Sequence, residues 1–390
     1  MSRAVGRRLG AGFWRRALTV AAAALALSTA ASGLEQREAA AKSYYAYVCA
    51  ESDDTIALVR FTPGAAGKGT LDLVKSIPIG VWPTDIEGPH GIGVHPDGRH
   101  WFVSLAHGNP FGSVWKFETG TDRKVATVEA GLFPASLDIA RSTGFLYVVN
   151  FNMHGDMVPS SVSVIETEEM AEIARIPTGI MPHGSRINAS GTRQYHVTMM
   201  DDLLHEIDAA GLKELRTLPL SPHAGHAMAA DTPEARAAMK AMMADMVQPT
   251  WATQPTRDGK VYVAGNKKNL LLEVDVASWT ISRTFSNTGD GIYNLDVTPD
   301  GRWLVATYKR GAAIGIWDLT KGIEAARIPT TRRVPHGVVI TPDQRFAFVT
   351  NEGIGGEPGT VEVYDLAART RAAAVDIGKQ AGGIAFWKAE

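Results

Sequence analysis

Short apolar runs separated by small polar turns recur along most of the chain. One example places Ile92-Gly93-Val94 before Pro96-Asp97-Gly98 and Trp101-Phe102-Val103 after it. Proline presets φ for a turn and glycine accepts positive φ, so this order predicts two antiparallel strands joined by a tight turn. The same order surrounds Pro299-Asp300-Gly301. The pattern therefore predicts a chain built from β-hairpins.

These hairpins keep a constant internal spacing. A residue at the start of each first strand lies twelve positions before an apolar residue of the second strand, and two further strand-like runs follow each hairpin. Repeats of roughly 43–48 residues with four short strands are typical of β-propeller blades. The six copies have these paired positions at residues 90 and 102, 135 and 147, 183 and 195, 250 and 262, 293 and 305, and 336 and 348.

The two ends of the chain supply a further blade. Runs 44–49, 56–61 and 71–77 read as three strands that lack an inner partner, and run 383–387 reads as an inner strand that lacks its neighbours. Pairing them closes the ring and removes exposed sheet edges. We therefore predict an all-β, seven-bladed propeller over residues 44–390, closed by its N- and C-terminal strands.

The first thirty residues have the order of a secretory signal peptide. Arginines precede an apolar run from Ala17 to Leu27, and small residues follow it. We expect cleavage of residues 1–30, a linker over residues 31–43, a periplasmic or secreted protein, and no membrane attachment after cleavage. The arginine pairs at 7–8 and 15–16 leave open Sec or twin-arginine export.

Charge and cysteine content exclude several classes of function. Loss of the five arginines in residues 1–30 takes the formal net charge from −2 to −7, which excludes a basic nucleic-acid footprint and attraction to anionic lipid. Cys49 is the only cysteine, so a site with two thiolates is excluded and we expect a small buried side chain there.

Histidine recurs at the start of the first strands. In a propeller these positions meet at one mouth of the central channel, and they are His90, Ala135, His183, Thr250, Tyr293 and His336. Three copies read Pro-His-Gly, at residues 89–91, 182–184 and 335–337. Neutral imidazoles around one centre suit copper, zinc or iron. Blade duplication without a ligand would also spread histidine to these positions.

Loops that follow the second strands add polar groups at the same mouth. His107 and His154 are further candidate metal ligands. Tyr293, Lys309, Arg310 and Glu352 are candidates to support a metal or to position a substrate.

The largest departure from the repeat is a His- and Met-rich insertion at residues 221–248, between blades four and five. Thr232 and Pro233 predict the start of a helix there, and Met239, Met242, Met243 and Met246 recur on one face. We expect this insertion to cover the mouth. Its methionines either pack on the rim or, with His223 and His226, help to bind copper.

Two strands carry a family resemblance. Phe348-Val349-Thr350-Asn351 and Tyr147-Val148-Val149-Asn150 resemble the repeat signature of the YVTN β-propeller family over about residues 44–390. The resemblance is specific for the fold and says little about function.

The Pro-His-Gly motifs and mouth histidines also resemble the propeller domain of nitrous oxide reductase and the related thiocyanate dehydrogenase, where channel-facing histidines hold copper. The resemblance implies a copper-dependent oxidoreductase with a small-molecule substrate and an electron-transfer protein as partner. It carries over firmly to His90, His183 and His336, and more weakly to His107 and His154. The chain has no cupredoxin domain and no second cysteine, which argues against nitrous oxide reduction. The mouth also has fewer histidines than a four-copper cluster needs, which favours a centre of one to three metal ions.

Two alternatives stay open on the sequence alone. A non-catalytic propeller would present the same mouth to a protein or small ligand. A lactonase-type hydrolase would need carboxylates around a cation, whereas this mouth is richer in histidine. Convergence of the imidazoles of His90, His183 and His336 on one point distinguishes a metal site from inherited repetition.

Overall fold

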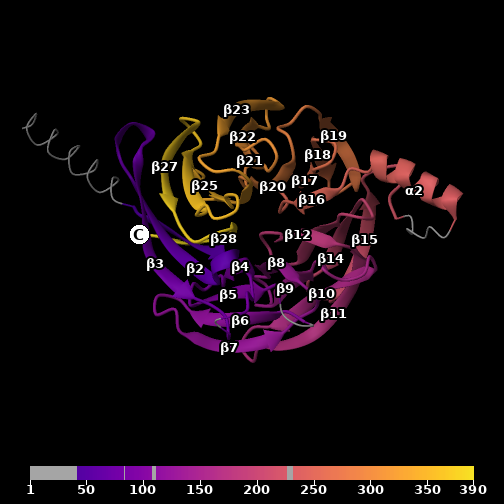
Figure 1. Ribbon diagram of the computed structural model, residues 1–390. Helices are drawn as coiled ribbons and strands as arrows, with labels where there is room; N and C mark the ends of the chain where they lie inside the picture. Colours follow the sequence, from indigo (N-terminus) through magenta and orange to yellow (C-terminus); the bar gives the residue numbers. More distant parts are fainter. Residues whose placement is uncertain (1–41, 83, 108–110, 226–231) are drawn as a thin grey trace, which may run out of the picture.

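The strands form a ring of seven four-stranded antiparallel sheets, as Figure 1 shows. The computed structural model describes residues 42–82, 84–107, 111–225 and 232–390. Neighbouring innermost strands contact one another around the whole ring, including β28 with β4 and β24 with β28. The predicted seven-bladed propeller is therefore confirmed.

Each blade runs from an innermost to an outermost strand in the same order. The first blade is β28 (Ala381–Ala389), β1 (Tyr44–Ala50), β2 (Thr55–Pro63) and β3 (Gly69–Pro78). Blades two to four are β4 (Pro89–Val94), β5 (His100–Leu105), β6 (Ser113–Glu118), β7 (Lys124–Glu129); β8 (Pro134–Ile139), β9 (Leu146–Asn150), β10 (Pro159–Glu166), β11 (Ala171–Ile180); and β12 (Pro182–Ile187), β13 (Arg193–Thr198), β14 (Leu203–Asp208), β15 (Lys213–Pro219). Blades five to seven are β16 (Pro249–Ala252), β17 (Lys260–Gly265), β18 (Leu270–Asp275), β19 (Thr280–Phe285); β20 (Ile292–Val297), β21 (Trp303–Tyr308), β22 (Ala313–Asp318), β23 (Ile323–Pro329); and β24 (Pro335–Ile340), β25 (Phe346–Asn351), β26 (Thr360–Asp365), β27 (Thr370–Asp376).

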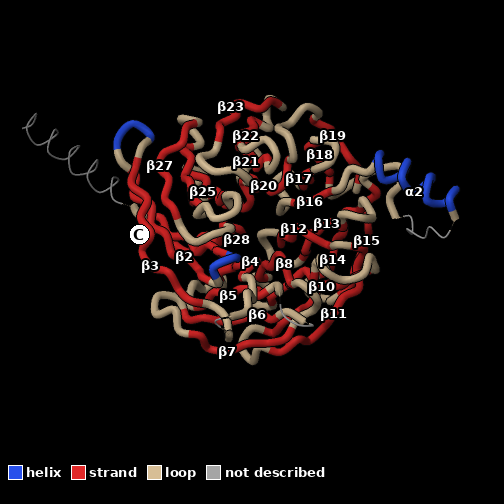
Figure 2. Tube along the Cα trace, in the orientation of Figure 1, coloured by secondary structure: helices blue, strands red, loops and turns tan. Residues whose placement is uncertain are grey.

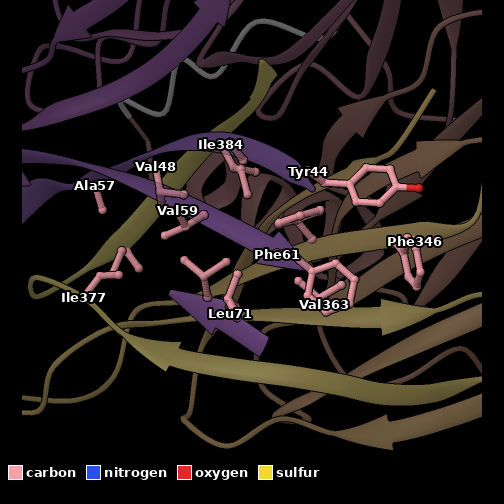
Figure 3. Close-up of a cluster of buried hydrophobic side chains, with 14 of the residues drawn as sticks. Tyr44, Val48, Ala57, Val59, Phe61, Leu71, Phe346, Val363, Ile377 and Ile384 are labelled. Atoms are coloured by element: carbon pink, nitrogen blue, oxygen red, sulfur yellow. The ribbon is translucent and has the colours of Figure 1, made fainter. Parts of the chain in front are cut away.

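The first blade joins the two ends of the chain, as predicted. Tyr44 in β1 pairs with Ala389 in β28, and Val48 pairs with Ile384. Side chains of the first and seventh blades interdigitate at this seam in Figure 3, where the rings of Phe61 and Phe346 meet edge to face at 4.9 Å. Burial of this apolar cluster holds the ring closed.

Helix is a minor component of the described residues, as Figure 2 shows. The turns η1 (Glu51–Asp53) and η2 (Ala65–Gly67) are short 3-10 segments, and α2 (Pro233–Asp245) is the predicted helix of the insertion. No described helix is long and apolar enough to cross a bilayer. The expected signal peptide, residues 1–30, and most of the linker lie outside the described residues, so both remain predictions.

The insertion does not lie over the channel mouth. Figure 1 shows α2 projecting from the outer edge of the ring, beyond β15. Glu234, Arg236 and Lys240 are exposed, no described side chain of the helix is buried, and buried residues follow it at Met246 and Val247. Lys267 and Lys268 of blade five bind the carbonyl of Met243 and the carboxylate of Asp245, which holds the end of the helix at this edge. The expectation that the helix covers the mouth is therefore wrong.

A register shift at the start of six innermost strands aims side chains into the mouth. In β4 it falls between Pro89 and Ile92, and in β24 between Pro335 and Val338. The extra residue of such a bulge turns a side chain out of the regular alternation. The same irregularity occurs in β8, β12, β16 and β20.

The glycine of Pro-His-Gly fits a close approach between neighbouring blades. A Cβ on Gly337 would stand 2.6 Å from the carbonyl oxygen of Gly382, and one on Gly91 would stand 1.9 Å from that of Ala135. Such contacts have no room for a methyl group, so the motif keeps glycine for backbone packing. Backbone packing therefore accounts for the glycine of the motif. It does not account for the histidine that precedes this glycine.

A methyl group at Gly337 should therefore destabilise the ring. We predict that Gly337→Ala lowers the free energy of unfolding by about 1–3 kcal/mol, because either strand must shift to relieve the overlap. Gly356→Ala is the matched control, since its Cβ would meet nothing within 4 Å. Chemical denaturation of both variants checks this, and equal stability would contradict the packing explanation.

Candidate functional site

Four aromatic side chains from innermost strands meet at the mouth. His90 comes from β4, His183 from β12, Tyr293 from β20 and His336 from β24. The Tyr293 hydroxyl lies 3.3 Å from Nε2 of His183 and 3.1 Å from Nε2 of His336. The rings of His90 and His336 have centroids 5.7 Å apart. The repeat position thus brings the three histidines of the Pro-His-Gly motifs together.

The outer nitrogen of His183 is anchored to backbone. Its Nδ1 lies 2.7 Å from the carbonyl oxygen of Thr250, and a carbonyl only accepts, so Nδ1 carries the proton. Nε2 is then the lone-pair nitrogen that faces Tyr293. Burial lowers the pKa of His183 to about 3, which keeps the ring neutral at physiological pH.

A buried carboxylate holds two further histidines. Glu51, in the turn after β1, lies 2.9 Å from Nδ1 of His90 and 3.0 Å from Nε2 of His107. Burial opposes the charge of Glu51, but His90 and His107 hold the pKa of this carboxyl well below its usual range. The hydrogen bond to Glu51 raises the pKa of His107. The carboxylate thus fixes the orientation of His90 and directs its Nε2 away from Glu51.

His336 has one nitrogen without a hydrogen bond. Its Nε2 faces the Tyr293 hydroxyl, whereas its buried Nδ1 has no hydrogen-bond partner among the described residues. Burial, together with the charge of Lys309, lowers the pKa of His336 far below its ordinary value. A buried ring nitrogen without a hydrogen-bond partner is costly in either tautomer and is uncommon in folded proteins.

A lysine and a glutamate complete the mouth on the other side. The ammonium of Lys309 lies 2.7 Å from Oε1 of Glu352 and 4.1 Å from the centroid of the Tyr293 ring. Burial alone would lower the pKa of Lys309, but Tyr293 and Glu352 raise it. The ion pair therefore places a fixed positive charge beside the phenol of Tyr293. This arrangement would suit the positioning role that the sequence predicts for Lys309 and Glu352.

Two phenylalanines form the wall on the side of blades two and three. Phe133 meets the rings of His90, His107 and His154 edge to face at 5.4, 5.2 and 5.2 Å. Phe151 meets His183 at 4.8 Å. His107 and His154 have ring centroids 5.5 Å apart, with His154 exposed. These two histidines therefore lie at the entrance, beside the buried ring.

A cavity continues inward from the histidines. His90, His183 and His336 line its outer end, and Arg186 and Trp251 line it further along the inner strands. The Arg186 guanidinium stacks over the Trp251 ring at 4.7 Å. The mouth thus has several imidazole nitrogens beside an internal cavity.

Other predicted site residues lie away from this centre. Arg310 hydrogen-bonds to Asp290, at 3.0 Å, and to Asn266, at 3.1 Å, and so braces exposed loops of blades five and six. Nε2 of His223 lies 3.6 Å from Asp245 in the peripheral insertion. His226 lies outside the described residues. The side chains that the structure brings together are therefore His90, His107, His154, His183, His336, Tyr293, Lys309 and Glu352.

Three residues of the site are missing from the sequence-based prediction: Glu51, Phe133 and Phe151. A signal for Glu51 was available, because it follows the second strand of its blade, as His107 and Glu352 do in theirs. The first blade begins with its second strand, so its loop is easily left out of the repeat. Phe133 and Phe151 carry no chemical signature that distinguishes them from core residues.

Comparisons with known proteins bear on the fold. No family model and no curated protein matches the sequence. Among solved structures, the chain is similar to one titled Kuenenia stuttgartiensis hydrazine synthase, with 18% identity and a TM-score of 0.60 over 78% of this chain and 91% of that one. At this identity the likeness shows the propeller fold alone. Membership of the YVTN family and the resemblance to nitrous oxide reductase are not confirmed by these comparisons.

Burial of neutral histidines should make stability depend on pH. Below pH 6.5 the unfolded chain protonates His183, whereas the folded chain does not until about pH 3, so stability falls as pH falls through this window. We predict that wild type loses about 1–2 kcal/mol more than His183→Asn between roughly pH 7 and pH 5. Asparagine retains a donor for the Thr250 carbonyl, and other titrating groups are common to both proteins.

Denaturant unfolding of the two proteins at both pH values measures this difference. An equal loss of stability would show that His183 is not buried and neutral in the folded protein.

Proposed function

We propose that this chain is a metal-binding β-propeller that holds copper among His90, His183 and His336 at the channel mouth. The observation that carries the proposal is how the imidazoles are held. Nδ1 of His183 bonds to a backbone carbonyl and Nδ1 of His90 to Glu51, which leaves each Nε2 available. Metal-ligating histidines in proteins commonly have their other nitrogen bonded in this way.

The chemistry of the donors supports a transition metal. His183 and His336 stay neutral well below physiological pH, so protons compete little for their nitrogens. Imidazole nitrogen suits copper, zinc, iron and nickel, and copper(II) binds most tightly at a given site of this kind. Nδ1 of His336 has no hydrogen-bond partner among the described residues, so this ring lacks the second bond that holds His90 and His183. We therefore propose copper first, with zinc or iron as the alternatives.

The side chains do not form a finished metal cage. In the described part of the chain no group of three or more His, Cys, Asp or Glu side chains is arranged to hold a metal ion. The Tyr293 oxygen lies between the two Nε2 atoms of His183 and His336. Metal entry would replace these two hydrogen bonds, so the proposal requires a local shift of the Tyr293 side chain. Lys309, which lies over this ring, would position it.

An oxidoreductase is the enzyme class that we propose for a copper site here. The cavity lined by the three histidines, Arg186 and Asn294 would hold a small substrate beside the metal, and Tyr293 with Lys309 would place a hydroxyl and a charge next to the imidazoles. A binding propeller without a metal is the second candidate, because the Tyr293 hydroxyl already bridges two of the histidines. A lactonase-type hydrolase gains little support, since Glu51 and Glu352 are bound to His90, His107 and Lys309.

Metal analysis tests the proposal. We predict near-stoichiometric copper in the protein purified after export, and its loss in His183→Ala/His336→Ala with the β-sheet circular dichroism retained. The control is His95→Ala/His100→Ala, at the hairpin turn on the opposite face. A wild-type protein that is metal-free and takes up neither copper nor zinc on reconstitution would contradict the proposal. It would favour the second candidate, a binding propeller without a metal.

Removal of the Glu51 carboxylate tests how His90 is held. We predict that Glu51→Gln weakens copper binding by about 10–100-fold, because the amide no longer fixes the His90 ring. Glu357→Gln, on an exposed loop, is the control. Competition titration against a copper chelator measures both. An unchanged affinity in Glu51→Gln would mean that His90 is no ligand.

A further inference from the structure

Exposed apolar side chains gather on the mouth face of the propeller. Among the described residues, the exposed large hydrophobic side chains that lie outside strands are all in loops on this face; the others lie mainly in outermost strands. Trp82 is 65% exposed and Val81 62%. The mouth-face set is Val81, Trp82, Ile86, Phe111, Leu132, Met153, Met157, Val158 and Ile354.

Most of this set forms one surface over blades one to three. Loop 79–88 joins the first blade to the second, Leu132 lies between the second and third, and loop 151–158 belongs to the third. We call the surface formed by these loops and Phe111 the docking face. The loops are neighbours, because the amide of His107 donates to the Glu87 carbonyl and the amide of Asn152 donates to the Leu132 carbonyl. Exposed apolar side chains gathered on one part of a protein surface commonly mark an interaction site.

The charges of the docking face have a single sign. Its loops carry Asp85, Glu87 and Asp156 and contain no lysine or arginine. Asp85 and Asp156 are exposed. On the other half of the mouth, the loops of blades five to seven carry exposed Lys267, Arg333 and Lys379. The docking face therefore combines exposed apolar side chains with carboxylates and has no basic side chain.

The docking face adjoins the histidine site directly. His154 is exposed in loop 151–158 and lies beside His107 and Phe133. Phe133 then contacts His90 in the buried ring. A partner on this surface would cover the entrance beside the histidines.

We propose that the docking face binds a small basic protein whose apolar contact patch is ringed by lysine and arginine. Complementary charge on the two partners speeds encounter and sets orientation, and the exposed apolar side chains supply contact area. A second copy of this chain fits less well, because two docking faces would bring acid against acid. An anionic membrane would be repelled for the same reason. The inference rests on the surface and is independent of the proposed metal site.

Titration with a defined basic probe tests the inference. The probe is mitochondrial cytochrome c, a small protein with an apolar haem edge ringed by lysines, and binding is measured by calorimetry with metal-free protein. We expect the probe to bind at about 10 mM ionic strength and its affinity to fall at least tenfold at about 0.2 M, where exposed charges are screened.

At low ionic strength, Trp82→Ser/Phe111→Ser should lower the affinity for the probe about tenfold relative to wild type. Asp85→Asn/Asp156→Asn should make the affinity less dependent on salt.

Matched controls separate this surface from general stickiness. Leu73→Ser/Ile323→Ser removes exposed apolar side chains from outermost strands and should leave binding unchanged. His183→Ala/His336→Ala should also bind the probe as wild type does. The probe titration therefore gives the same result whether or not the metal proposal is correct. No salt-sensitive binding, or equal binding by the Trp82 variant, overturns the inference. If this chain forms a dimer and Trp82→Ser/Phe111→Ser dissociates that dimer, the docking face binds a second copy of the chain. That result would overturn the inference of a basic partner.

Discussion

The histidine site depends on how closely neighbouring innermost strands approach at the mouth. Carbonyl oxygens of the ring residues accept hydrogen bonds from the preceding blade: Ser104 donates to Ala135, Thr307 to His336 and Thr350 to Gly382. The same hydroxyls of Thr307 and Thr350 accept from the amides of Asn294 and Gly337 inside the bulges. The bulges of β4, β20 and β24 are thereby tied to the next blade, and the side chains that they carry point into the channel. Closure of the ring by β28 completes this chain of contacts.

That backbone frame lets the protein bury several imidazoles in neutral form. Desolvation disfavours a charged histidine, so His183 and His336 stay uncharged beside the ammonium of Lys309. Glu51 has the opposite role, as a buried carboxylate stabilised by two histidines of the neighbouring blade. The site thus contains two neutral imidazoles around Tyr293, with the Lys309–Glu352 ion pair beside them, and a separate carboxylate–histidine cluster around Glu51. His90 belongs to both, because it bonds to Glu51 and its ring lies near that of His336.

The repeat made the fold and the centre of the site predictable. Spacing alone places His90, His183, Tyr293 and His336 at one mouth, because a propeller repeats its geometry from blade to blade. Features outside the repeat were harder to predict. The sequence predicts the insertion at 221–248 over the mouth, yet chain connectivity does not decide whether a helix turns inward. Contacts from Lys267 and Lys268 of blade five to the end of the helix hold it at the edge. Arg310 has the right position in the repeat, but Asp290 and Asn266 draw its side chain outward.

Electron paramagnetic resonance of the copper(II)-loaded protein, with isotopically labelled histidine, tests the proposed site most directly. Hyperfine coupling counts the imidazole nitrogens on the metal and identifies them through single variants. Our account predicts coupling to the nitrogens of His90, His183 and His336, with one coupling lost in each of His90→Ala, His183→Ala and His336→Ala. A spectrum that is unchanged in these variants but altered in His223→Ala would place the copper on the peripheral insertion and contradict the account.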